Sequence, residues 1–130
     1  MSTETIDITR RYFAAVAAGD IPALTDLLAE DLGWHQPGRS SLSGKYTSRD
    51  AVFGLIGAFM QRSGGSFAID RVGTFLANGD LVAATVHFRA SREGAEMAMN
   101  GIDLLRIEGG RIREVWLFSE DQAAEDRFWG

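Results

Sequence analysis

The chain has 130 residues, of which 45% are hydrophobic and 24% charged, and its formal net charge is −5. This composition is ordinary for a globular protein, and the length predicts one domain over residues 1–130 that buries roughly two thirds of the surface of its unfolded chain. The acidic balance and the single lysine, Lys45, argue against nucleic acid as a partner, because phosphate binding depends on clustered Lys and Arg. The absence of cysteine excludes disulfides, a thiolate nucleophile and a structural zinc site.

Membrane, metal and nucleotide functions are disfavoured as well. No apolar run approaches the ~20 residues that span a bilayer, and the opening Met-Ser-Thr-Glu lacks a basic segment followed by an apolar one. The histidines His35 and His87 stand apart without convergent carboxylates, and the Gly-Gly pairs are typical of turns rather than of a phosphate loop. We therefore expect a cytoplasmic protein with no membrane partner, no metal and no cofactor.

The chain begins with helical patterns. Apolar residues recur at helical spacing from Thr5 to Ala18, with Tyr12 beside the apolar face, and Gly19 ends this helix. Asp20 is placed to cap a short second helix that has Pro22 in its first turn.

A short strand and a third helix follow. The strand is expected over Leu32–Gln36 and ends at Pro37, after which a polar loop runs to the next helix. Thr47 and Asp50 have the spacing of a capping box, which predicts that the third helix begins near Thr47. The run Ser63-Gly64-Gly65 ends it.

The second half of the chain is patterned as antiparallel strands. Asn78-Gly79 predicts a tight hairpin, because these residue types accept the positive φ of its turn. The strands that follow are expected over Leu81–Ser91, Met97–Ile107 and Arg111–Phe118, with turns at Glu93-Gly94 and Gly109-Gly110. Ser119 and Gln122 have capping-box spacing and predict a closing helix. Helices followed by a meander predict an α+β fold, a cone in which helices pack on one face of a strongly curved sheet that encloses an apolar pocket.

Asp103 stands where a carboxylate is unfavourable. One face of its strand carries Met97, Met99, Gly101, Asp103, Leu105 and Ile107. An acid among apolar neighbours must be paired, reached by water or kept protonated. It is either an edge acid that touches solvent or a pocket acid with a raised pKa, which is how binding sites hold a proton donor at neutral pH.

The neighbouring strands indicate which residues face inward. In Leu81–Ser91 the apolar face carries Val86 and Phe88, so His87 is expected to point outward and not to be catalytic. In the last strand both faces carry large apolar groups, and Trp116 and Phe118 would form an apolar patch on the outer face. Such patches mark interfaces, so we expect a homodimer through the outer sheet face, with His87 in the contact.

The Leu32–Gln36 strand offers further site candidates. Trp34 and Gln36 share one face, where Trp34 either packs in the core or stacks on a ligand. His35 titrates near neutral pH, but alternation places it on the opposite face unless a bulge beside Pro37 reverses it.

These residues together resemble the nuclear transport factor two-like superfamily, and within it the ketosteroid isomerase and SnoaL-like polyketide cyclase branch. The resemblance covers nearly the whole chain. It is carried by Arg11-Tyr12-Phe13-Ala14-Ala15 with Ala18-Gly19-Asp20, by Trp34-His35-Gln36-Pro37-Gly38, by Asp103 to Ile107 with Gly110-Arg111-Ile112, and by Glu114-Val115-Trp116 with Asp121.

The resemblance implies a cofactor-free site. In steroid isomerases of this fold a tyrosine and an aspartic acid donate hydrogen bonds to a developing oxyanion, and the matching residues are Tyr12 and Asp103. The aspartate that shuttles the proton is replaced by Gln36, and an amide cannot take up a proton at useful pH. If the protein is an enzyme, the base must be His35 after a local shift, Asp121, or Asp103 itself. Tyr12 also has a purely packing interpretation.

Two classes of function therefore stay open. The first is an enzyme that enolises a small apolar carbonyl compound, as an isomerase, cyclase or dehydratase would, with Asp103 and Tyr12 as donors. The expected pocket residues are Trp34, Gln36, Phe53, Val86, Phe88, Met97, Met99, Val115 and Leu117. The second is a non-catalytic dimeric ligand-binding or interaction domain. Epoxide hydrolysis, also found on this fold, needs an Asp–Arg–Asp set, of which the sequence supplies one pocket acid.

Overall fold

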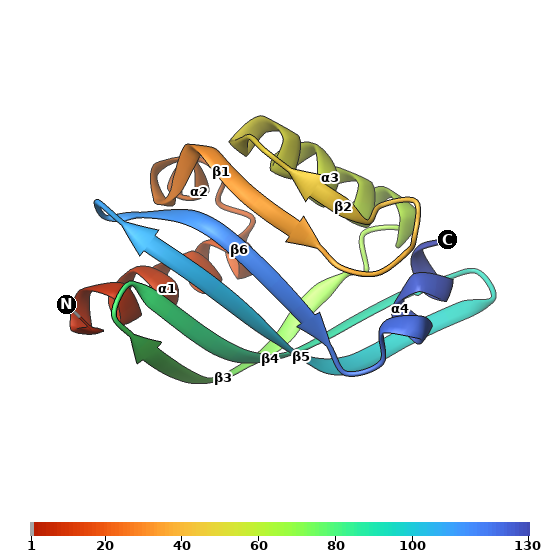
Figure 1. Cartoon of the computed structure of the whole chain (residues 1–130). Helices are drawn as coiled ribbons and strands as arrows, with labels where there is room; N and C mark the ends of the chain where they lie inside the picture. Colours follow the sequence, from red (N-terminus) through yellow and green to blue (C-terminus); the bar gives the residue numbers. More distant parts are fainter. Residues whose placement is uncertain (1) are drawn as a thin grey trace.

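The computed structural model describes residues 2–130, in which four helices pack against one six-stranded sheet (Figure 1). The helices are α1 (Ser2–Ala18), α2 (Ile21–Leu27), α3 (Arg49–Arg62) and α4 (Gln122–Trp129). The strands are β1 (Leu28–Gln36), β2 (Gly44–Tyr46), β3 (Ala68–Asn78), β4 (Leu81–Arg92), β5 (Ala95–Glu108) and β6 (Arg111–Ser119). Their order across the sheet is β2-β1-β6-β5-β4-β3, and every neighbouring pair is antiparallel except β1 and β6.

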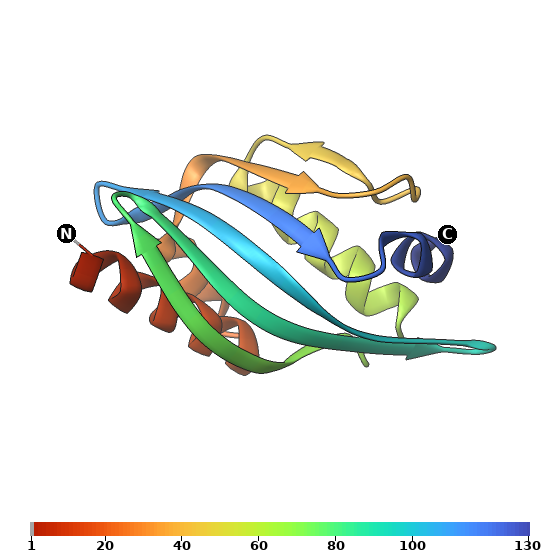
Figure 2. The same cartoon turned by 60° about the horizontal axis from the view of Figure 1, so that its bottom comes forward.

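The helices cover one face of the sheet. Helix α1 packs on β3 and β4, α3 packs on β1, and α4 meets β5 and β6 at the end of the sheet. In Figure 2 the strands lie in front of α1 and α3, so that the uncovered outer face is turned toward the reader. This confirms the expected α+β fold with helices on one face of a curved sheet. None of the helices in residues 2–130 combines the length and hydropathy needed to cross a lipid bilayer.

Bulges account for the curvature of the sheet. In β3 the pairing with β4 shifts twice, between Ile69 and Arg71 and again between Val72 and Phe75. An extra residue bends its strand and increases the local twist, so two bulges in one strand turn it sharply.

A bulge breaks the alternation of side chains along β6. The partners of this strand shift at Ile107, which pairs with Ile112 while Arg106 pairs with Glu114. Strict alternation would place Ile112 on the outer face with Trp116. The extra residue instead turns Ile112 into the core, where it is fully buried.

The core confirms the predicted inner faces of the two central strands. Buried residues alternate along β4 at Val82, Ala84, Val86, Phe88 and Ala90, and along β5 at Met97, Met99, Asp103, Leu105 and Ile107. Helix α1 buries Ile8 and Tyr12 and exposes Ala17. Tyr12 therefore lies in the middle of the buried face of α1, not beside it.

Two helix caps differ from the predicted ones. The N-cap of α3 is Ser48, whose side chain accepts a hydrogen bond from the backbone of Ala51, so Thr47 lies one residue outside the helix. The N-cap of α4 is Asp121, which accepts from the backbone of Ala124. In both caps a side-chain oxygen accepts a hydrogen bond from the backbone N–H three residues later, as N-caps do. The predicted cap residues, Thr47 and Ser119, were therefore wrong.

The first hairpin turn is also displaced by one residue. Asn78 pairs with Leu81, so the two loop residues are Gly79 and Asp80. Gly79 has a φ of 61°, and no residue other than glycine has a positive φ in residues 2–130. A glycine at the first loop position is typical of a type II′ turn. The stretch Gly44–Tyr46, expected as loop, forms the edge strand β2.

We expect two glycine-to-alanine substitutions to act in opposite directions. A Cβ at Gly101 would lie 2.7 Å from the carbonyl oxygen of Phe118 and 3.1 Å from the ring of Phe88, which the packed sheet cannot relieve, whereas a Cβ at Gly57 in α3 meets nothing within 4 Å. Gly57→Ala should stabilise the protein by roughly 0.5–1 kcal/mol through the chain entropy of glycine. Gly101→Ala should cost about 1–3 kcal/mol. Urea unfolding followed by tryptophan fluorescence measures both, and equal midpoints for the two variants would contradict the described packing.

Candidate functional site

Asp103 lies in the middle of the sheet, on the face that the helices cover. It pairs with Ala84 of β4 on one side and with Leu117 of β6 on the other. Its side chain is 7% exposed. The sequence prediction that an acid occupies the inner face of this strand is therefore confirmed.

The carboxyl group of Asp103 and the hydroxyl group of Tyr12 have no protein partner within residues 2–130. None of the hydrogen bonds or ion pairs formed by side chains in this part of the chain involves either group. Every fully enclosed side-chain nitrogen or oxygen in residues 2–130 does have a partner. These two groups therefore keep contact with space that a water-sized molecule can reach, as ligand-binding groups do.

Burial changes the acidity of both groups. Removal from water raises the pKa of Asp103 to about 7, and the negative charge of Glu125 contributes in the same direction. Burial also raises the pKa of the Tyr12 hydroxyl, with a smaller contribution from the charge of Asp103. At neutral pH Tyr12 is a donor and Asp103 carries a proton for a large part of the time, so both can donate a hydrogen bond to a ligand oxygen.

Glu125 is a buried acid that sequence reasoning missed. It belongs to α4 and is 5% exposed. Its Oε1 accepts hydrogen bonds from Ser119 Oγ at 2.7 Å and Gln122 Nε2 at 3.1 Å, and its Oε2 accepts from Trp129 Nε1 at 3.2 Å. The available signal was its spacing, because Glu125 precedes Phe128 by three and Trp129 by four residues and so shares a helix face with two buried aromatic rings.

Trp34 and Gln36 form a buried pair at the end of β1. Both are almost fully buried on the same face of the strand, as predicted. The Nε1 of Trp34 donates a 3.2 Å hydrogen bond to Oε1 of Gln36. The amide oxygen that stands in the place of the isomerase base is thus already engaged by the protein.

His35 lies on the opposite face of β1, as alternation predicts. Its Nε2 lies 2.6 Å from Oε2 of Glu114, and its ring stacks on Trp116 with centroids 5.4 Å apart. The hydrogen bond with His35 holds the pKa of Glu114 below its ordinary value. His87 is likewise engaged on the outer face, by Asp70 at 2.7 Å, and Asp121 is an exposed helix cap. These residues are not brought together with Asp103.

The remaining predicted pocket residues line the interior. Trp34, Val86, Phe88, Met97, Met99 and Val115 are buried, and Phe53 and Leu117 are partly buried against the core. An interior pocket between these side chains stays a prediction.

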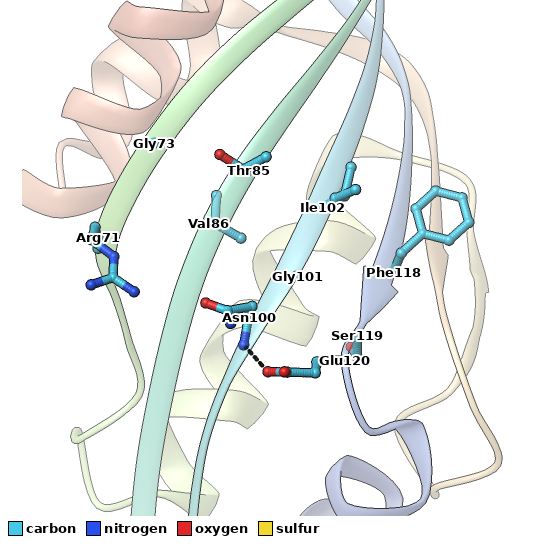
Figure 3. A pocket seen from close by; sticks show the side chains of 10 residues that line it. All are labelled: Arg71, Gly73, Thr85, Val86, Asn100, Gly101, Ile102, Phe118, Ser119 and Glu120. Carbon is cyan, nitrogen blue, oxygen red and sulfur yellow. Dashed lines mark hydrogen bonds between the residues drawn. The ribbon is translucent and has the colours of Figure 1, made fainter.

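Two hollows open on the surface, and neither is the predicted pocket. The first, here called the outer hollow, has a volume of about 530 Å³ and lies on the uncovered face of the sheet (Figure 3). Its lining comprises Arg71, Gly73, Thr85, Val86, Asn100, Gly101, Ile102, Phe118, Ser119 and Glu120. The second has about 590 Å³ and lies between the start of α3 and the arginines Arg111 and Arg113. Of the predicted pocket residues, Val86 alone lines either of these two hollows.

Comparison with known proteins defines the family. Residues 9–115 match the model of the SnoaL-like domain family. The chain belongs to this family. An uncharacterized protein of Mycobacterium tuberculosis is 32% identical to it over 124 residues, which cover 95% of each chain.

Solved structures of similar proteins have the same fold as this SnoaL-like domain. A protein of unknown function with a cystatin-like fold from Xanthomonas campestris is 44% identical, with 97% of this chain and 98% of the other aligned and a TM-score of 0.93. An NTF2-like protein from Burkholderia xenovorans is 20% identical, with 100% and 98% aligned and a TM-score of 0.81. IdmH from Streptomyces antibioticus, described as a candidate polyketide cyclase, is 23% identical, with 89% and 91% aligned and a TM-score of 0.73.

The raised pKa of Asp103 predicts how stability depends on pH. The folded protein binds this proton more tightly than the unfolded chain, so the stabilisation is complete below the ordinary value of 3.8 and is lost as the pH rises through about 7. Asp103→Asn removes this titration. We expect the stability of the variant relative to wild type to grow by up to roughly 4 kcal/mol between about pH 4 and about pH 8.

Urea unfolding at several pH values measures this difference. Asp70→Asn on the outer face is the control, because the hydrogen bond with His87 lowers the pKa of Asp70 and its contribution is instead lost as the pH falls. A stability difference for Asp103→Asn that does not change with pH would show that Asp103 is not desolvated.

Proposed function

We propose that this SnoaL-like protein enolises a small, mostly apolar carbonyl compound without a cofactor, as an isomerase, cyclase or dehydratase would. The observation that carries the proposal is the pair formed by Asp103 and Tyr12. Both are buried, both can donate a hydrogen bond at neutral pH, and neither is bound by another group in residues 2–130. Polar groups left available in an apolar interior are typical of a ligand site.

The two donors would act on the carbonyl oxygen. When a base removes a proton from the carbon beside the carbonyl group, the electron pair moves onto the oxygen, which becomes negatively charged. Donors fixed in a dry site stabilise that charge, because they need no reorganisation as it develops. A neutral carboxylic acid is a strong donor in this role, and the raised pKa of Asp103 supports it.

The base is not Gln36, because its amide is bound by Trp34 and cannot accept a proton at useful pH. The proposal therefore favours substrates whose proton is already acidic, such as a methylene group between two carbonyls. For these, water is a sufficient base, since Asp103 is occupied as the donor to the carbonyl oxygen. The description of some neighbours of the same fold as candidate polyketide cyclases agrees with such substrates.

The second candidate function is ligand binding without turnover. The observation that favours it is the Trp34–Gln36 hydrogen bond at the position where isomerases carry a base. A pocket that keeps the donors and lacks the base would bind a carbonyl compound and leave it unchanged.

Exchange of α-protons for deuterium separates the two functions. With β-tetralone in D₂O, followed by proton NMR, we expect exchange faster than in buffer alone. Asp103→Asn should reduce the enzymic rate by about 10²–10³ and Tyr12→Phe by less, in line with the loss of one oxyanion donor. His35→Gln, on the outer face, is the matched control and should keep the wild-type rate. Exchange no faster than buffer across several ketones would support binding without turnover.

We further propose that the protein is a homodimer through the outer sheet face. Phe118 is 55% exposed, Ile102 is 41% exposed, and both line the outer hollow (Figure 3). Leu76 on β3 adds a third exposed apolar side chain. No helix covers this apolar face, and burying it against a second copy of the chain would remove apolar surface from water.

Phe118→Glu should disrupt this dimer, because it places a charge in an apolar contact. Light scattering coupled to size exclusion should show a dimer for wild type and a monomer for the variant. Ile21→Glu is the control, since Ile21 is similarly exposed, at 50%, but begins α2 on the helical side. A wild-type monomer would refute the proposed interface.

A further inference from the structure

Glu125 is fixed beside the Asp103 site by the register of the sheet. It accepts a hydrogen bond from Ser119, the last residue of β6. Ser119 pairs with Gly101, and Leu117 pairs with Asp103, so Ser119 and Asp103 occupy diagonal positions on one face of the sheet. Gly101 has no side chain that could separate them. The two carboxyl groups, which are 22 residues apart in sequence, thus share one buried region.

The surroundings of Glu125 suit an anion. Gln122 Nε2 and Trp129 Nε1 can only donate hydrogen bonds, and the Ser119 hydroxyl completes a set of three contacts on the two carboxylate oxygens. Asp103 accepts no hydrogen bond from the groups in residues 2–130. None of the ion pairs in this part of the chain includes Glu125 or Asp103.

Two buried carboxylates without a cation repel each other strongly, so the pair is stable when one of them holds a proton. Three donors stabilise the charge on Glu125 and none stabilises it on Asp103. The proton therefore belongs on Asp103.

We propose that Glu125 is a positioning residue of this site, a fixed negative charge that keeps Asp103 in its acid form, so that Asp103 can donate a hydrogen bond to a carbonyl ligand. The inference rests on the proposed function, in which Asp103 donates a hydrogen bond. It also defines the ligand class. With Glu125 ionised and Asp103 neutral, the site repels anions, so the ligand is a neutral carbonyl compound rather than a keto acid.

The other charged or titratable groups near the pair form contacts of their own, and none of the ion pairs in residues 2–130 joins them to Glu125 or Asp103. Tyr12 faces Asp103 from α1 and is neutral. The inner faces of β4 and β6 contribute Val82, Ala84, Val86, Ile112, Val115 and Leu117. Asp126 shares the Gln122 amide, while Arg62 and Arg92 donate to the last backbone carbonyls of α4.

The test is a carbon NMR titration of the Asp103 carboxyl group in the whole protein. Wild type should titrate near 7. In Glu125→Gln, which removes the charge, the midpoint should fall by on the order of one pH unit. Trp129→Phe is the matched control, because it removes one hydrogen bond to Glu125 but keeps the charge, and its midpoint should fall by much less than that of Glu125→Gln.

A second variant keeps the test valid if Glu125→Gln disturbs the packing of α4. In Glu125→Gln the new amide can turn its NH₂ group toward the indole N–H, and two donors would then oppose each other. The double variant with Trp129→Phe removes that conflict and should show the same lowered midpoint.

The outcomes separate the two proposals. A wild-type midpoint near 3.8, the ordinary value, overturns the proposed function itself. A wild-type midpoint near 7 that Glu125→Gln leaves unchanged overturns the role of Glu125 alone. An equal fall in Trp129→Phe shows that Glu125 acts through the packing of α4, which also overturns it.

Discussion

The cost of burying a carboxyl group in the centre of a sheet governs the site of this protein. Asp103 stands between Ala84 and Leu117, with no cation and no hydrogen-bond donor from residues 2–130. Ionisation there is unfavourable, so the folded state stores a proton that an exposed aspartic acid would have released. A structure optimised for stability alone would place an apolar residue at this position.

The sequence was sufficient to locate this acid because the sheet is buried on one face. Successive side chains of a strand point to opposite faces of the sheet, so every second residue faces the core. The apolar residues of β4 and β5 show which set of alternate residues that is. The same argument placed His35 and His87 on the outer face, where they pair with Glu114 and Asp70. The overall fold followed from the order of helices and strands together with the family resemblance.

Features that depend on tertiary geometry were beyond local patterns. The bulge that turns Ile112 inward inserts one residue into β6, and nothing in the alternation of that strand marks the insertion. Ser48 and Thr47 are both good caps, so the choice between them is decided by where the chain enters α3. Glu125 received no role from the sequence, and it is a buried charge because α4 docks against the end of β6.

The positions of Gln36 and Glu125 together indicate how this site differs from the isomerases that it resembles. At the end of β1 an acid is absent, and the amide in its place is bound by Trp34. An acid instead enters from α4, where it is held by three donors and is poorly placed to move a proton. The isomerases thus carry a base that moves a proton, whereas this chain carries a fixed anion in another part of the site. Under the proposed function, the donors Asp103 and Tyr12 stabilise the charge on a substrate oxygen, whereas the missing base leaves the removal of a proton from carbon to the acidity of the substrate itself.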